Sequence, residues 1–103
     1  MRPTYYRLDG HDPVPCTMME WGRQGEDRGP PDPWRVDETM VGHLRVSTVF
    51  LGLDHQWHPD GPPLLFETMI FDGSEDEYQE RCSTWDEAVQ MHAEAVAAAR
   101  LRT

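Results

Sequence analysis

Four side chains that can bind metal ions or exchange protons lie within one short segment of the sequence. Asp54, His55, His58 and Asp60 supply carboxylates and imidazoles, which are the ligand types of Zn²⁺, Mn²⁺, Ni²⁺ and iron sites. The segment is also rich in Gly and Pro, and a His-x-x-His pair in such a loop lacks the helical spacing of a known zinc site. We therefore expect a polar turn, in which Asp54 caps the backbone and His55 forms side-chain hydrogen bonds. A metal site is the alternative, but we expect no metal and no other cofactor.

Glu67 is a further candidate, because it is a carboxylate within an apolar run. A carboxylate is costly to bury without a partner, so we expect an ion pair with Arg45 or Arg81, or a position on a partly exposed face of the sheet. The alternative is a site shared with His55, in which a raised pKa would let Glu67 act as a general base. The sequence contains no P-loop, nucleophile elbow, dinucleotide-binding glycine motif or helical zinc-protease motif. We therefore assign no catalytic residue, and a small metal-dependent or acid/base enzyme remains the rival hypothesis.

Trp57 lies among these polar residues and points to a different function. Aromatic side chains dominate the energetics of protein interfaces, and the prolines of this segment would reduce the entropy lost on binding. The neighbouring carboxylates of Asp54 and Asp60 would favour a basic partner surface. We expect Trp57 to be either an exposed contact residue or a lid that folds back onto the sheet.

Two runs of β-branched and aromatic residues, 44–53 and 64–71, flank the loop and predict a long antiparallel hairpin. We expect Leu51 to lie opposite Phe66. Both faces of this hairpin are apolar, so the strands should be central and at least partly covered on both sides. An apolar pattern on both faces specifies the register only weakly. The side chains expected to be largely buried are Val49, Phe50, Leu51 and Phe66.

The N-terminal third predicts a small hairpin, or merely a turn, and then a short helix. Asp9-Gly10 is a tight-turn signal, and the prolines that follow restrict the second arm to an edge. Thr17 and Glu20 have the spacing of a capping box, which predicts a helix over 18–24 with Met19 and Trp21 buried. Residues 25–33 are rich in Gly, Pro and charged residues, and we expect a loop there.

The C-terminal third predicts two more strands and a longer helix. Strands are expected at 34–40 and 78–82, with an acidic turn at 72–77. Thr84 and Glu87 form a second capping box, which begins a helix over 85–101. Its apolar stripe should pack on the sheet and consists of Trp85, Ala88, Val89, His92, Val96 and Ala99. We expect His92 to be a hydrogen-bonded core histidine, and Trp21, Trp34 and Trp85 to be core residues.

These elements together predict an α+β fold. The four strands should form an antiparallel meander sheet, because strands joined by short turns usually pair. A short N-terminal helix and a C-terminal helix should pack on it. With 103 residues, the chain 1–103 is expected to form a single domain.

Charge and composition restrict the classes of partner. The formal net charge is −10, from 19 acidic and 9 basic residues, which argues against direct nucleic-acid binding because phosphates are bound through Lys and Arg. No apolar run approaches the roughly 20 residues needed to cross a bilayer, and the first residues do not form a secretory signal. We expect a cytoplasmic protein in which Cys16 and Cys82 are reduced thiols.

The segment 46–71 also resembles a known type of sequence. It has the pattern V-S-T-V-x-L-G-L-D-H and then G-P-P-L-x-F-E-T-M-x-F, and a T-x-x-E-A-x-x-x-H helix follows. This pattern is similar to that of a family of small uncharacterised phage and prophage proteins, many of them actinobacterial. The resemblance covers 46–71 closely and 78–92 more loosely. It implies an accessory protein that acts in the host cytoplasm, and it brings no catalytic residue.

The leading hypothesis is therefore an interaction protein that binds a host or phage protein. One specific version is an inhibitor of a bacterial defence nuclease or CRISPR complex, in which acidic side chains would occupy a basic nucleic-acid channel. A second rival, besides the enzyme, is a small-ligand binding module that uses the sheet face opposite the helix.

Overall fold

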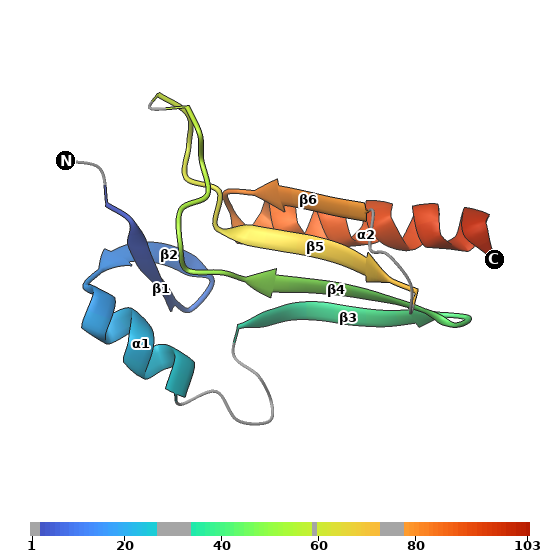
Figure 1. Cartoon of the computed structure of the whole chain (residues 1–103), viewed down its shortest axis with the longest axis horizontal. Helices are drawn as coiled ribbons and strands as arrows, with labels where there is room; N and C mark the ends of the chain where they lie inside the picture. The colour runs from blue at the N-terminus through green and yellow to red at the C-terminus, as the bar shows by residue number, and fades with distance from the viewer. Residues whose placement is uncertain (1–2, 27–33, 59, 73–77) are drawn as a thin grey trace.

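The computed structural model describes residues 3–26, 34–58, 60–72 and 78–103. Strands β3 to β6 form an antiparallel sheet in that order, and β1 and β2 form a separate hairpin. Figure 1 shows the sheet with α2 along one side, while α1 lies beside the hairpin at the other end. This confirms the α+β fold and the four-stranded meander. The elements in chain order are β1 (Tyr5–Asp9), β2 (Asp12–Cys16), α1 (Met18–Glu26), β3 (Arg35–Val41), β4 (Leu44–Phe50), β5 (Phe66–Phe71), β6 (Tyr78–Cys82) and α2 (Trp85–Arg102).

The local signals of the N-terminal part predicted its elements well. Gly10 turns between β1 and β2 with a φ of 63°, a conformation that glycine adopts without steric cost. At the start of α1, the Glu20 amide donates to Thr17 Oγ1 at 3.1 Å, and the Thr17 amide donates to Glu20 Oε1 at 3.2 Å. The helix continues through residues 25 and 26, which we had expected in the loop. The rest of that expected loop, like most of the acidic turn at 72–77, lies outside the described residues.

The helix α2 begins at the second capping box and packs across the sheet. The Glu87 amide donates to Thr84 Oγ1, and the Thr84 amide donates to Glu87 Oε1, both at 3.1 Å. The stripe differs from the prediction because Val89 is 50% exposed. Met91 takes part instead, since steps of three and four residues from Ala88 stay on one helix face. The buried side chains are Ala88, Met91, His92, Ala95, Val96 and Ala99.

The predicted register of the central hairpin is wrong by one residue. Phe50, and not Leu51, lies opposite Phe66, and Thr48 lies opposite Thr68. Because side chains alternate between the faces of a strand, this register turns Phe50 and Thr48 toward α2 together with their partners. Both candidate registers offered apolar faces, so the sequence pattern could not separate them.

The chain leaves the sheet at Gly52, which shortens both strands of the hairpin. Gly52 has a φ of 70°, and a Cβ atom there would lie 2.7 Å from Trp21 Nε1 and 2.9 Å from the Tyr6 carbonyl oxygen. The segment then pairs with the N-terminal hairpin: the Tyr6 amide donates to the Gly52 carbonyl at 2.8 Å, and the Asp54 amide donates to the Thr4 carbonyl at 3.0 Å. β4 therefore ends at Phe50, and β5 begins at Phe66.

The core lies between the sheet and α2, and its aromatic end extends to the N-terminal hairpin. Phe50 and Phe66 are buried as predicted, and Trp34 joins them. Val49 and Leu51 are only half-buried, because the corrected register turns them away from α2. Met19 is 68% exposed, contrary to expectation, whereas Trp21 and Trp85 pack at the edge of the core.

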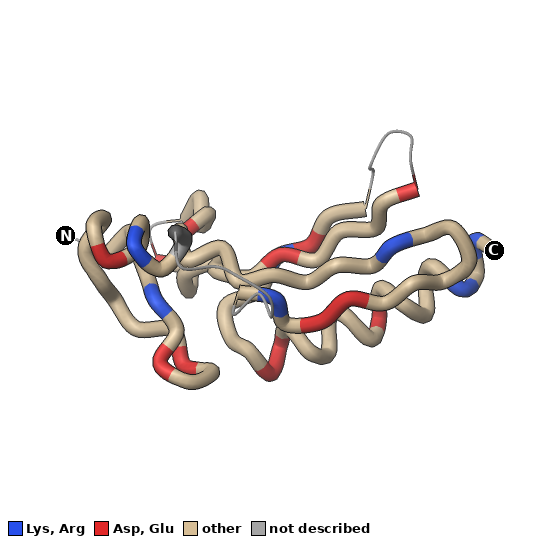
Figure 2. Tube along the Cα trace, turned by 90° about the horizontal axis from the view of Figure 1, so that it is seen from below, with Lys and Arg blue, Asp and Glu red and all other residues tan. Residues whose placement is uncertain are grey.

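One face of the sheet has no helix over it in the part of the chain that is described. Figure 2 views the sheet along its edge, and α2 runs along the other face. The side chains of β4 and β5 on this second face are half-buried or buried, which agrees with the expected partial cover of both faces. Within the described ranges, neither helix is long and apolar enough to span a membrane.

Candidate functional site

The carboxylate of Asp54 joins the two ends of the loop between β4 and β5. Its Oδ1 atom accepts hydrogen bonds from the Gln56 amide at 2.8 Å and from the Leu64 amide at 3.1 Å. The His55 amide adds a backbone bond to the Leu64 carbonyl at 3.1 Å. Asp54 thus caps the turn, as the sequence predicted, and a carboxylate is well suited to accept two N–H groups.

The side chain of Gln56 organises the outer part of the same loop. Its Nε2 donates to the Pro62 carbonyl at 3.0 Å, and its Oε1 accepts from the His58 amide at 3.0 Å. Gly61 packs so closely that a Cβ atom there would collide with the Gln56 amide. Sequence analysis did not single out Gln56, because glutamine is not a typical turn residue and its contacts depend on the folded loop.

Trp57 lies at the outer part of this loop and is 90% exposed. Figure 1 shows the loop projecting beyond the ends of β4 and β5. The alternative in which Trp57 folds back as a lid is therefore wrong. Its neighbours His58 and Asp60 are also exposed, so the loop presents one large aromatic ring among polar side chains.

The imidazoles and carboxylates of the loop do not assemble into a metal site in this structure. Asp54 directs Oδ1 to backbone amides, His55 is half-buried, and Asp60 is exposed. Among the described residues, no three His, Cys, Asp or Glu side chains gather as metal ligands would. The backbone of His55, rather than a side-chain bond, carries its hydrogen bond to the loop.

Glu67 pairs across the sheet with β6. Its Oε2 accepts from Arg81 Nε at 2.9 Å and from Gln79 Nε2 at 2.7 Å. The register places Glu67 directly opposite Arg81, so of the two predicted cations the structure selects this one. Arg45 instead approaches Glu38 at 3.2 Å and stacks over the Phe71 ring at 4.3 Å. Glu67 is thus a paired residue of the open sheet face.

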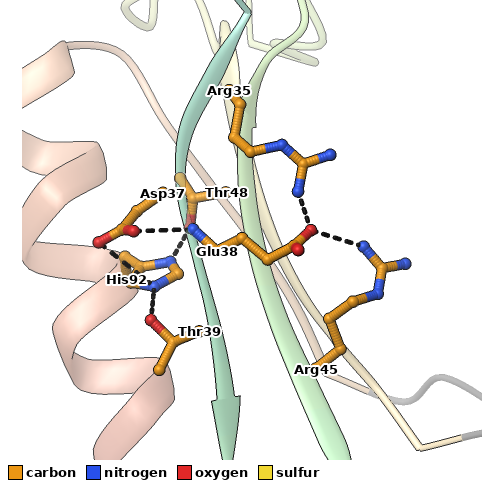
Figure 3. Close-up of polar contacts among 7 residues, drawn as sticks. All are labelled: Arg35, Asp37, Glu38, Thr39, Arg45, Thr48 and His92. Carbon is orange, nitrogen blue, oxygen red and sulfur yellow. Dashed lines mark hydrogen bonds and ion pairs between the residues drawn. The ribbon is translucent and has the colours of Figure 1, made fainter. Parts of the chain in front are cut away.

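The two sides of β3 carry different polar contacts. Figure 3 shows Asp37 and Thr39 directed toward His92 of α2, whereas Glu38 points away, toward Arg35 and Arg45. Glu38 forms ion pairs with both arginines. The alternation of side chains at Asp37, Glu38 and Thr39 therefore separates a polar cluster around the buried His92 from an exposed ion-pair cluster.

The buried cluster connects α2 to three strands through hydroxyl groups. His92 Nδ1 lies 2.7 Å from Thr48 Oγ1, and His92 Nε2 lies 2.9 Å from Thr39 Oγ1. Thr48 Oγ1 in turn lies 2.5 Å from Thr68 Oγ1. His92 is 4% exposed, and Thr48 and Thr68 are fully buried, so these three groups are closed to solvent. The prediction of a hydrogen-bonded core histidine is confirmed.

Burial lowers the pKa of His92, because the charged imidazolium loses its hydration, while the carboxylate of Asp37, 3.7 Å from Nε2, acts in the opposite direction. The neutral imidazole has one donor and one acceptor nitrogen, and each threonine hydroxyl can complement either. Sequence analysis missed the threonines, since only the correct register places Thr48 and Thr68 beneath the helix.

Both cysteines are free thiols, as expected. Burial, with a smaller contribution from Glu87, raises the pKa of Cys82 to about 11. Burial also raises the pKa of Cys16. Because the thiolate is the reactive form, neither environment activates a nucleophile.

Comparisons with protein-family models, with curated proteins and with solved structures found no match for this chain. Function is therefore inferred from the structure itself. The relevant surfaces are the exposed loop, the two faces of the sheet and the surface between β6 and α2.

Proposed function

We propose that this chain is a small interaction protein that binds a host or phage protein through the loop 54–63, with Trp57 as its anchor. The observation that carries the proposal is the 90% exposure of Trp57 on a loop whose backbone is held by Asp54 and Gln56. Single exposed apolar residues are common on surfaces. A tryptophan at the tip of a hydrogen-bonded, projecting loop is a more specific arrangement.

The loop is organised before any partner arrives, which favours binding. A flexible loop loses conformational entropy when it is ordered in a complex, whereas a preformed loop loses less. A tryptophan buries on the order of 150–250 Å², and each Å² contributes about 25 cal/mol when it is removed from water. Full burial of Trp57 could therefore supply a large part of the binding free energy.

The charge of the chain favours a basic partner. The formal net charge is −10, and Figure 2 shows acidic positions distributed from the N-terminal hairpin to α2. Complementary charge accelerates association and disfavours acidic partners. Asp60, exposed beside the anchor, adds a negative charge at the contact itself.

The narrower form of the proposal concerns the partner. The resemblance to phage-encoded proteins supports a phage-type accessory role in the host cytoplasm, and the acidic charge fits the basic nucleic-acid channel of a bacterial defence complex. This form predicts that the chain and nucleic acid compete for the same partner, and that added salt weakens the complex.

The test is a pull-down from host lysate with wild-type protein and two variants, Trp57→Ala and Leu101→Ala. Leu101 is the matched control, because it is also 90% exposed but lies on α2. Trp57→Ala should lose the stoichiometric partner while its free energy of unfolding changes by less than about 0.5 kcal/mol. Leu101→Ala should retain the partner. Recovery of no stoichiometric partner by the wild type, or equal recovery by both variants, would overturn the proposal.

A further inference from the structure

A groove of about 470 Å³ runs between the edge strand β6 and the helix α2. Glu80 and Cys82 contribute from β6, and the side chains of α2 that line it follow the helical repeat. Its floor is less polar than its rim, because Met91 is 5% exposed and the Cys82 thiol is partly buried. The lining residues are Glu80, Arg81, Cys82, Asp86, Glu87, Gln90, Met91 and Glu94.

The outer edge of β6 borders this groove. In the described part of the chain β6 pairs with β5 on one side and is the last strand of the sheet. An edge strand presents unpaired N–H and C=O groups that another extended segment can use. Along β6, Glu80 faces the α2 side, whereas Gln79 and Arg81 face the open side and bond to Glu67. A strand added here would therefore have one face over the groove.

The charge of the groove selects the occupant. Four of its lining residues carry carboxylates: Glu80, Asp86, Glu87 and Glu94. The cation of the lining, Arg81, is held by Glu67 at 2.9 Å on the open face. A second copy of this chain would bring the same carboxylates together, which is unfavourable. A segment with basic side chains complements the groove.

We propose that the edge of β6 binds an extended basic segment of a partner protein as an added strand. Backbone hydrogen bonds to β6 would supply the pairing, and alternate Arg or Lys side chains would reach the carboxylates of the groove. The apolar stems of these side chains would cover Met91. This surface is separate from the Trp57 loop, and the proposal does not depend on that loop.

The first experiment titrates isotope-labelled wild-type protein with a seven-residue peptide of alternating Arg and Val, observed by NMR. The largest amide shifts should fall on β6 and on the first three turns of α2. N-methylation of one alternate set of peptide amides should weaken binding at least about tenfold, and methylation of the other set should change it little, since only one set faces β6. Equal effects of the two sets, or no shifts in β6, would overturn the proposal.

The second experiment compares two double variants with the same change in net charge. Glu80→Gln/Glu94→Gln removes charges from the groove, and Asp37→Asn/Glu38→Gln removes exposed charges from β3, the opposite edge strand of the sheet. The first should weaken peptide binding at least about tenfold and the second less than about twofold, because β3 lies three strand spacings, roughly 14 Å, from β6 and exposed charges beyond a Debye length are screened. Equal weakening would show long-range attraction alone and overturn the proposal.

A third comparison separates this proposal from the function proposed for the loop. Trp57→Ala should bind the Arg/Val peptide as the wild type does, whereas a Glu/Val peptide should not bind either protein. A Trp57→Ala variant that lost the peptide would contradict the separate surface, whatever the pull-down showed.

Discussion

The β4–β5 loop and the helix–sheet interior both depend on polar side chains, but they use them over different distances along the chain. In the loop, Asp54 and Gln56 bond to groups two, six and ten residues away. In the interior, His92 bonds to threonines 44 and 53 residues away. The side-chain bonds of the loop therefore stay within ten residues, although its base also pairs with the N-terminal hairpin at Thr4. The interior cluster forms only when sheet and helix are together.

The loop exposes a side chain to solvent, whereas the interior cluster depends on one particular register of the sheet. In the loop, Asp54 and Gln56 bond to backbone groups, and Trp57 stays exposed. The interior places Thr48 opposite Thr68 and both beneath His92. A shift of the hairpin by one residue would put Thr48 and Thr68 on opposite faces of the sheet and break the chain of hydroxyl contacts from Thr68 through Thr48 to His92. The buried cluster thus favours the observed register, which the apolar pattern alone does not.

The largest expected difference in stability between the two regions appears when one aromatic ring is deleted from each. Phe66 is fully buried, and Phe66→Ala should lower the free energy of unfolding by about 3–5 kcal/mol. The corresponding change in the loop, Trp57→Ala, should stay within about 0.5 kcal/mol. Urea unfolding measures both. Comparable losses would show that the loop belongs to the cooperative core.

Removing the His92 imidazole should lower the free energy of unfolding less than removing the Phe66 ring does. Its effect should be coupled to that of removing the Thr48 hydroxyl. His92→Leu leaves the hydroxyls of Thr39 and Thr48 without this partner, which should cost about 1–3 kcal/mol. In a double-mutant cycle with Thr48→Val, the combined loss should be smaller than the sum of the single losses. Additive losses would argue against the bond between Thr48 and His92.

Acid should weaken the helix–sheet interior through His92. The pKa of His92 is lower in the folded chain than in the unfolded chain, chiefly because of burial. The unfolded chain therefore takes up a proton first as the pH falls, so the stability present above about pH 6.5 decreases from there down through the folded pKa. The slope from this group cannot exceed about 1.4 kcal/mol per pH unit.

Urea unfolding at several pH values tests this effect, with His92→Gln as the control. The groups that face His92 are Asp37 and Thr39 from β3 and Thr48 from β4. Asp37 opposes the shift, so Asp37→Asn should enlarge the pH dependence. If wild type and His92→Gln lose stability equally between pH 7 and 5, other groups cause the loss.

The smallest effect on global stability is expected at the base of the loop. Asp54→Ala removes the acceptor of the Gln56 and Leu64 amides and should cost about 1 kcal/mol. Its local effect should be larger, with faster hydrogen exchange at these two amides. Asp60→Ala, at an exposed position of the same loop, is the control and should change neither quantity.

Deletion of the capping carboxylate should also reduce partner binding, because a looser loop loses more entropy in a complex. Unchanged partner affinity in Asp54→Ala, together with increased exchange in the loop, would show that the loop's order does not contribute to binding.

The sequence by itself determined most elements of this protein, because their signals are local. Both capping boxes and the Gly10 turn are set by residues within a few positions of one another. The same is true of Asp54, whose capping role follows from a short carboxylate beside backbone amides. Such contacts form with little dependence on the rest of the chain.

Only the tertiary structure decided which surfaces these elements share. Two apolar faces left the hairpin register open, and the break at Gly52, packed against Trp21, set the limits of the strands. The same packing exposed Met19 and Val89 and brought Met91 into the core. The choice of Arg81 for Glu67 and the hydroxyl partners of His92 followed from that register. These outcomes depend on contacts between residues distant in sequence. Alternative registers and partners have similar free energies until the helix and the sheet pack together.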